Sequence, residues 1–151
     1  MVRTVLRPYR ADDLETAISL WRRAWEATFP EIDFSARLPW FRERWTKELV
    51  PNNAIRIAER DDEMTGFVVV DPSSGYLDQL AVAPELWGEG IAGELIAEAK
   101  RLVPSGIVLH VNTENLRAIR FYERMNFARV GEDVERNPFS NLPIWRYAWK
   151  P

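Results

Sequence analysis

The chain has 151 residues, of which 46% are hydrophobic and 28% are charged, the size and composition of one globular domain spanning residues 1–151. Its net charge of -3 argues against general binding of nucleic acids or anionic membranes, because those partners require a basic surface. It contains no cysteine and one histidine, which excludes disulfides, thiolate nucleophiles and a histidine-rich metal site, and we expect no bound metal.

The first half of the chain is predicted to form two helices between strands. Apolar residues recur at spacings of three and four from Leu14 to Phe29, which predicts an amphipathic helix, and Asp12 has the position of its capping acid. A polar turn at residues 61–63 separates two apolar runs and predicts a hairpin. In chain order, the expected elements are a strand at 3–8, helices at 12–29 and 35–49, and strands at 54–60 and 65–70.

The second half is predicted to alternate strands and helices and to end in a hairpin. Pro84 stops an apolar strand before a glycine-rich helix start, and Asn115 has the position of a cap on the last helix. The expected elements are a strand at 76–82, a helix from 88 to 102, a strand at 107–111, a helix at 115–125, and strands at 127–135 and 143–149. The order βααβββαβαββ describes an α/β (α+β) protein.

The glycines between the fourth strand and the following helix predict a phosphate-binding site. Gly88, Gly90 and Gly93 leave main-chain N–H groups free to point at an anion, and the helix dipole favours negative charge there. The same string matches the dinucleotide fingerprint G-x-G-x-x-G. A dinucleotide fold places its first glycine directly after a strand, whereas Pro84 and its neighbours separate Val82 from Gly88, and the chain after Gly93 is short for a doubly wound sheet.

Two segments resemble signatures of the GNAT superfamily of acetyl-CoA-dependent N-acetyltransferases. Residues 80–95, LAVAPELWGEGIAGEL, look like its CoA-binding motif Q/R-x-x-G-x-G/A, with Gly90 and Ala92 in the last two places and Trp87 at the Gln/Arg place. Residues 115–127, NLRAIRFYERMNF, are similar to the motif N-x-x-A-x-x-F-Y-x-x-x-G-F. Asn126 replaces the glycine of that motif, and asparagine tolerates the left-handed conformation that a helix end requires.

The resemblance implies a GNAT-like mixed sheet, flanked by helices, that splays apart between the strands ending at Val82 and Val111. Acetyl-CoA would lie in that opening as the co-substrate. Main-chain groups near Leu80 and Val82 would bind the pantetheine arm as an added strand does, while the glycine segment holds the pyrophosphate. The cofactor-binding residues expected on this basis are Leu80, Val82, Gly88, Gly90, Ile91, Ala92, Gly93 and Asn115.

The resemblance also implies that Tyr122 donates the proton that the departing CoA thiolate requires. A tyrosine pKa of about 10, against about 8.5 for a thiol, permits this donation. A backbone N–H near Val82 would polarise the thioester carbonyl. Phe121, the neighbour of Tyr122, is the aromatic residue expected to pack on the sheet.

The general base has two main candidates. His110 lies in Leu-His-Val, where ribosomal-protein alanine acetyltransferases of this superfamily have Leu-Glu-Val, and a neutral imidazole at pH 7 suits the role. Asp78 is the rival carboxylate, on the same strand face as Leu80. The alternatives are a structural histidine in the core and a salt-bridged Asp78. Glu135 or a water relay remains a further possibility for the base.

The acceptor site is expected among the aromatic residues of the two N-terminal helices. The sequence contains seven tryptophans, and Trp21 and Trp25 share a helix face with core residues, so we expect them to pack in the core. Aromatic walls can hold a flat or hydrophobic amine, or a cation through its attraction to the rings. The expected acceptor-binding residues are Trp40, Glu31 and Phe139.

These features together predict an acyltransferase that moves an acetyl group from acetyl-CoA to a primary amine of a small molecule, by direct attack in a ternary complex. The alternatives are acetylation of a protein N-terminus or lysine, and a non-catalytic CoA-binding module. We expect no nucleic-acid or membrane partner, and exposed edges in the C-terminal hairpin favour a homodimer. No signal-peptide or membrane-spanning run is visible, so we expect a cytoplasmic protein.

Overall fold

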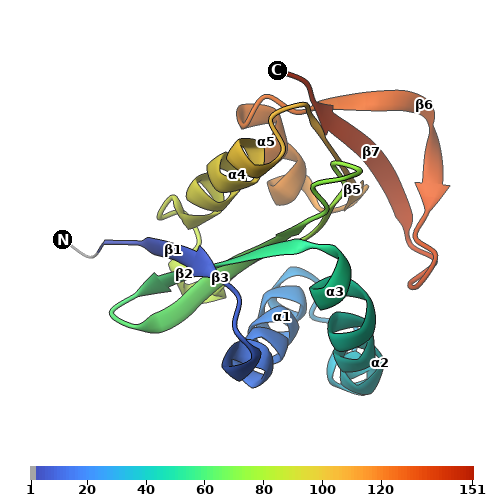
Figure 1. The fold of residues 1–151 in the computed structure, drawn as a ribbon. Coiled ribbons are helices and arrows are strands. Elements are labelled where there is room, and N and C mark those ends of the chain that lie inside the picture. Colours follow the sequence, from blue (N-terminus) through green and yellow to red (C-terminus); the bar gives the residue numbers. More distant parts are fainter. Residues whose placement is uncertain (1–2) are drawn as a thin grey trace.

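Figure 1 shows the fold of the chain in a computed structural model that describes residues 3–151. The strands are β1 (Val5–Pro8), β2 (Ala54–Arg60), β3 (Glu63–Val70), β4 (Leu77–Val82), β5 (Ile107–Asn112), β6 (Ala128–Arg136) and β7 (Pro143–Trp149). The α-helices are α1 (Leu14–Thr28), α2 (Leu38–Arg44), α3 (Val50–Asn52), α4 (Ile91–Leu102) and α5 (Leu116–Arg124). Every predicted strand and helix is present, with ends that differ by a few residues.

The strands form two antiparallel sheets, ordered β1-β2-β3-β4 and β5-β7-β6. β4 and β5 run parallel where the sheets meet, joined by an isolated bridge between Tyr76 and Val108. There the Val108 amide donates a hydrogen bond of 2.9 Å to the Gly75 carbonyl. The expected mixed, splayed sheet is therefore two antiparallel sheets that touch at the start of β4 and separate beyond it.

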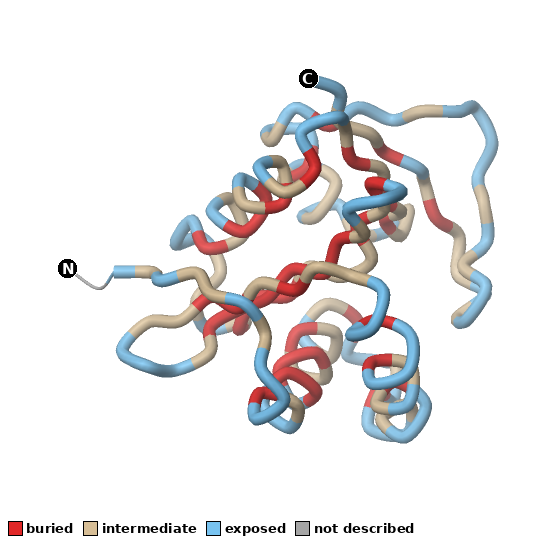
Figure 2. The backbone as a smooth tube through the Cα atoms, in the orientation of Figure 1, coloured by how far each residue is buried: buried red, intermediate tan, exposed pale blue. Residues whose placement is uncertain are grey.

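Helices cover both faces of the first sheet, as Figure 1 shows, with α1 and α2 on one face and α4 on the other. Successive side chains of a strand point to opposite faces, and the last four residues of β3, 67–70, are all apolar and buried. Phe67 and Val69 pack in the cluster that contains α1 and α2, whereas Val68 and Val70 pack in the cluster that contains α4 and β5. Both cores therefore pack against β3, one on each face. In Figure 2 the buried residues, in red, run along the strands of this sheet.

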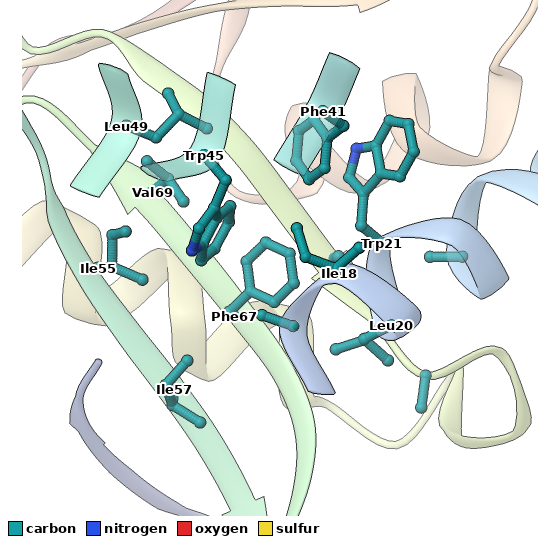
Figure 3. Close-up of a cluster of buried hydrophobic side chains, with 14 of the residues drawn as sticks. Ile18, Leu20, Trp21, Phe41, Trp45, Leu49, Ile55, Ile57, Phe67 and Val69 are labelled. Carbon is teal, nitrogen blue, oxygen red and sulfur yellow. The ribbon is translucent and has the colours of Figure 1, made fainter. Parts of the chain in front are cut away.

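The core on the α1 and α2 face combines aliphatic side chains with aromatic rings (Figure 3). Trp21 stacks on Phe41 with ring centroids 3.9 Å apart, and Trp45, fully buried, meets Phe67 edge-on at 5.1 Å. The prediction that Trp21 is a core residue is confirmed. Trp25 differs, because it is half-buried and also lines the cavity described below.

The helix predicted at 35–49 continues further than expected. A 3-10 turn leads into α2, a π-helical turn at Trp45–Leu49 follows, and α3 carries the helix to Asn52. Pro51 lies inside this continuous helical run, which ends at Asn52, three residues beyond the predicted end at residue 49. The wide turn keeps both Trp45 and Leu49 in the core.

The start of α1 is fixed by Asp13, not by the expected capping acid Asp12. Asp13 accepts hydrogen bonds of 2.8 and 2.7 Å from the Arg7 guanidinium and one of 2.8 Å from the Arg10 amide. Asp13 is 9% exposed, whereas Asp12 is exposed to solvent. The ion pair with Arg7, together with the other contacts of the carboxylate, holds the pKa of Asp13 below its usual value. This cluster ties β1 to α1.

We expect Asp13→Asn to lower the free energy of unfolding by about 2 kcal/mol near neutral pH, because the hydrogen bonds to a charged partner are lost. The pKa of Asp13 is lowered in the folded state, so its contribution is present above the unfolded pKa of about 3.9 and disappears as the pH falls through the folded value. Denaturant unfolding should therefore show the difference between variant and wild type shrinking below about pH 4. Asp12→Asn is the control and should change little. A difference that persists unchanged in acid would contradict this account.

Candidate active site

A cavity of about 970 Å³ lies where β4 and β5 separate. Its walls come from β4, the segment leading into α4, β5, α5, the helices α1 and α2, and the loop between β6 and β7. All but one of the site residues expected from the sequence line it: Trp40, Asp78, Leu80, Val82, Gly88, Gly90, Ile91, Ala92, Gly93, His110, Asn115, Tyr122 and Phe139. Glu31, the exception, is exposed and lies outside the lining.

The glycine segment forms the turn into α4. Gly88 and Gly90 have φ values of +87° and +88°, and a Cβ at either position would meet open space, so backbone conformation and not crowding requires glycine there. Gly90 is the N-cap of α4, and the Glu94 amide donates to its carbonyl at 3.1 Å. The amides of the first turn, from Ile91 to Gly93, therefore have no helical acceptor and border the cavity.

The edge of β4 that faces β5 presents free backbone groups to the cavity. The Ala83 amide donates to Thr65 of the β3 side at 2.8 Å, and alternate residues of an antiparallel strand direct their polar groups to opposite sides. Leu80 and Val82 therefore direct their backbone amide and carbonyl groups toward the opening between β4 and β5. The Val82 carbonyl accepts a 2.9 Å hydrogen bond from the Trp87 indole N–H, while the amide of Val82 remains available.

The Trp87 ring also stacks with Arg117, a residue for which the sequence predicted no role. The Arg117 guanidinium carbon lies 3.5 Å from the centroid of the Trp87 ring, which is the stacked geometry of a cation–π contact. Both side chains line the cavity beside the glycine turn. Asn115 caps α5 as predicted, with its side-chain oxygen accepting from the Ala118 amide at 3.2 Å, and so fixes the turn that carries Arg117.

Tyr122 is buried in the wall formed by α5. Its ring meets Phe121 at 5.3 Å and Phe127 at 5.6 Å, both edge-on. Burial raises the pKa of Tyr122, which keeps the phenol protonated at neutral pH. The turn after α5 is held by Asn126 at a φ of 70° and by a 2.9 Å bond from the Phe127 amide to the Tyr122 carbonyl, which confirms the predicted left-handed asparagine.

His110 is part of a polar cluster and is not an isolated core histidine. Its Nδ1 lies 2.8 Å from the Tyr76 hydroxyl, and its Nε2 lies 3.4 Å from a Glu135 carboxylate oxygen. When the Tyr76 hydroxyl donates to Nδ1, the ring proton is on Nε2 and faces Glu135, which also accepts from Arg146 at 3.1 Å. Burial raises the pKa of Tyr76 to about 12. Tyr76 carried no sequence signal beyond its place at the start of a strand.

Asp78 forms an ion pair. Both of its carboxylate oxygens accept from Arg44, at 2.8 and 2.6 Å, and the Gln79 side-chain amide donates to the same carboxylate at 3.0 Å. A register shift at this point of β4 leaves Asp78 without a partner residue on β3. Both carboxylate oxygens of Asp78 are therefore occupied by Arg44, which confirms the salt-bridge alternative predicted from the sequence.

One wall of the cavity is formed by aromatic side chains from two distant segments. Phe139, in the loop between β6 and β7, lies 5.0 Å from Trp40 of α2 and 4.9 Å from the guanidinium carbon of Arg44. Asn137 shapes the loop by accepting from the amides of Phe139 and Ser140. Trp40 and Phe139 thus come together as one wall, although a long stretch of chain separates them.

The chain matches the model of the family described as Acetyltransferase (GNAT) family over residues 14–127. The chain belongs to the GNAT acetyltransferase family. The matched residues extend from the start of α1 to the end of the turn after α5, so they contain both strands and all the helices that border the cavity of this acetyltransferase.

Several relatives of this GNAT acetyltransferase carry substrate names. The peptidyl-lysine N-acetyltransferase YjaB of Salmonella typhimurium is 30% identical over 127 residues, covering 83% of this chain and 84% of the relative. A spermidine N(1)-acetyltransferase of Thermoplasma acidophilum is 27% identical over 151 residues, covering 89% and 92%. The crystal structure of the PaiA N-acetyltransferase from Thermoplasma acidophilum, in complex with coenzyme A, shares the fold with a TM-score of 0.81 at 19% identity, covering 99% of each chain.

The part of the chain that the structure describes has neither a cluster of metal-binding side chains nor a membrane-spanning helix. Within residues 3–151, no group of three or more acidic or histidine side chains is placed to hold a metal ion. None of the helices in the same part of the chain is both long and apolar enough to cross a membrane.

We expect removal of Arg44 to destabilise the fold, because Asp78 would keep its charge in a largely buried place without a partner. The two side chains are 12% and 14% exposed, so Arg44→Met should cost about 3 kcal/mol in denaturant unfolding, and the double variant Arg44→Met/Asp78→Leu should recover much of that loss. Arg23→Met, which breaks an exposed pair with Glu85, is the matched control and should change stability by less than about 1 kcal/mol. Equal effects of the two single variants would show that the pair at Asp78 is not structural.

Proposed function

We propose that this GNAT acetyltransferase moves an acetyl group from acetyl-CoA to a primary amine of a small molecule, by direct attack in a ternary complex. The observation that carries the proposal is one cavity that borders both the glycine turn before α4 and the aromatic wall of α2 and the β6–β7 loop. A donor and an acceptor can therefore occupy the same space, as direct transfer requires.

The residues on the donor side fit acetyl-CoA. The free amides at the start of α4 suit the pyrophosphate, and the open edge of β4 at Leu80 and Val82 suits the amide groups of pantetheine. We assign the polar side-chain contact that a Gln or Arg usually makes at the Trp87 position to Arg117, which Trp87 holds beside the same turn. The indole N–H cannot bind phosphate itself, because the Val82 carbonyl occupies it.

In the proposed reaction, the neutral amine attacks the thioester carbonyl, the new C–N bond forms and the C–S bond breaks. The Val82 amide is the donor that polarises the carbonyl. The Tyr122 hydroxyl gives its proton to the departing thiolate. Tyr122 lines the cavity, so its hydroxyl can give its proton to a thiolate bound there.

The amine must lose a proton, and we assign its removal to the cluster around His110. The Tyr76 hydroxyl passes the proton to Nδ1, and the Glu135 carboxylate near Nε2 stabilises the imidazolium that results. Asp78 is not assigned to this step, because Arg44 holds both of its oxygens.

A protein lysine is the second candidate acceptor, because YjaB of Salmonella typhimurium is a peptidyl-lysine N-acetyltransferase and is 30% identical to this chain over 127 residues. The small molecule is favoured by the contact of Trp40 with Phe139, which gives an aromatic wall to the part of the cavity between α2 and the β6–β7 loop, here called the acceptor end. Acetylation of a peptide lysine with far higher kcat/KM than any small amine would reverse this order.

The function is tested first by ligand binding and then by turnover. Acetyl-CoA or CoA at about a hundred times its dissociation constant should add about 2.7 kcal/mol to the unfolding free energy and raise Tm by several degrees, whereas NAD should not. Tyr122→Phe should lower kcat by about 100-fold, and His110→Ala should also lower kcat, both with unchanged CoA binding. The proposal fails if NAD is the only ligand that raises Tm, or if none of the three ligands raises it.

The role of Arg117 is tested by comparing two ligands that differ in phosphate. Arg117→Ala should weaken CoA binding about tenfold, the value of one charge-assisted hydrogen bond, and leave the binding of pantetheine, which lacks the phosphates, unchanged. Arg120→Ala is the control, since Arg120 is an exposed arginine of the same helix that lies outside the cavity lining. If Arg117→Ala weakened both ligands equally, Arg117 would only support the cavity wall.

A further inference from the structure

The charges at the acceptor end of the cavity are unequally neutralised. Its two carboxylates are both paired: Asp78 with Arg44 at 2.6 Å, and Glu135 with Arg146 at 3.1 Å. Glu135 also faces His110. A cationic group entering the cavity would therefore meet carboxylates whose charge is already compensated.

Two arginines of the same end have no carboxylate partner among residues 3–151. The guanidinium carbon of Arg37, at the start of α2, lies 5.4 Å from the centroid of the Phe34 ring. Arg136, at the end of β6, donates to the backbone carbonyl of Asn141. Both line the cavity, and Arg37 is half-buried there. An anion at Arg37 would be its first charged partner.

The wall beside Arg37 is apolar and aromatic. Trp25 stacks between Phe29 and Phe34 with centroid distances of 6.0 Å to each, and all three rings line the cavity. Phe29 and Phe34 are buried, whereas Trp25 is half-buried. A flat apolar group is suited to this wall, because it can pack against the Trp25 ring and replace water there.

We propose that the acceptor is an amine that carries a carboxylate on an aromatic or apolar body, with Arg37 binding the carboxylate. This inference rests on the proposed function and names the substrate class of the same site. Uncompensated positive charge also disfavours the ammonium form of the acceptor and so favours the neutral amine that attacks. Polyamines add a second cation, so we expect them to be poor acceptors for this cavity, although one relative is a spermidine acetyltransferase.

The test uses three amines with one body and different para substituents: benzylamine, 4-(aminomethyl)benzoate and p-xylylenediamine. We expect kcat/KM, measured by release of the CoA thiol, to be at least about 10-fold higher for the carboxylate than for benzylamine, and lowest for the diamine. Binding of each amine to the CoA complex, measured by calorimetry, should follow the same order.

The role of Arg37 is tested with two variants of this residue, each paired with a control variant. Arg37→Ala should reduce the preference for the carboxylate to nearly none, and Arg37→Glu should make the diamine the best of the three. The matched controls are Arg42→Ala and Lys47→Glu, at exposed residues outside the lining whose pairs with Glu15 and Glu43 are on the surface. Both controls should keep the wild-type order.

The outcomes separate this inference from the proposed function. Equal kcat/KM for the three amines, or a wild-type preference for the diamine, overturns the inference while acetyl transfer itself stands. Tightest binding of the carboxylate without any acetylated product supports the ligand class and refutes the proposed function. A carboxylate preference that survives in Arg37→Glu overturns the role of Arg37.

Discussion

The site depends on one interruption in the hydrogen-bonding between parallel strands. β4 and β5 meet at the Tyr76–Val108 bridge and then separate, so the backbone groups that a continuous sheet would pair remain on the edge of β4. Such groups need water or a ligand as partner. The turn before α4 follows β4, and α5 follows β5, so both helix starts border the same opening. The cavity is therefore a consequence of strand pairing that stops early.

The residues around the bridge also fix the chemistry at its edge. Tyr76 joins the two sheets through its backbone and binds His110 through its hydroxyl. Asp78, displaced by the register shift in β4, binds Arg44 of α2, and Arg44 in turn lies against Phe139 of the distant loop. One set of contacts thus connects the helices, the first sheet and the β6–β7 loop. It also leaves the proposed acceptor end with compensated carboxylates, whereas Arg37 has no carboxylate partner among residues 3–151.

Prediction from the sequence succeeded where short-range rules decide. The strands and helices follow from periodicity, and Gly90, Asn115 and Asn126 occupy the helix ends that their side chains favour. It was wrong on the capping acid of α1, because Arg7 of β1 selects Asp13 over its neighbour. It also placed the end of the second helix three residues early, at residue 49, because the helix continues through a π-helical turn to Asn52. These misses share a cause, since each depends on packing against another element.

The sequence by itself determined the element order, the glycine turn and the family signatures, because these depend on residues a few positions apart. Only the tertiary structure decided which polar side chains are partners. The Tyr76–His110 and Arg44–Asp78 contacts each join residues 34 positions apart, and no periodic pattern encodes them. The same holds for Arg117 on Trp87 and for the exclusion of Glu31 from the cavity. Charge compensation is a property of such pairs, so the distribution of charge in the cavity depends on the folded chain.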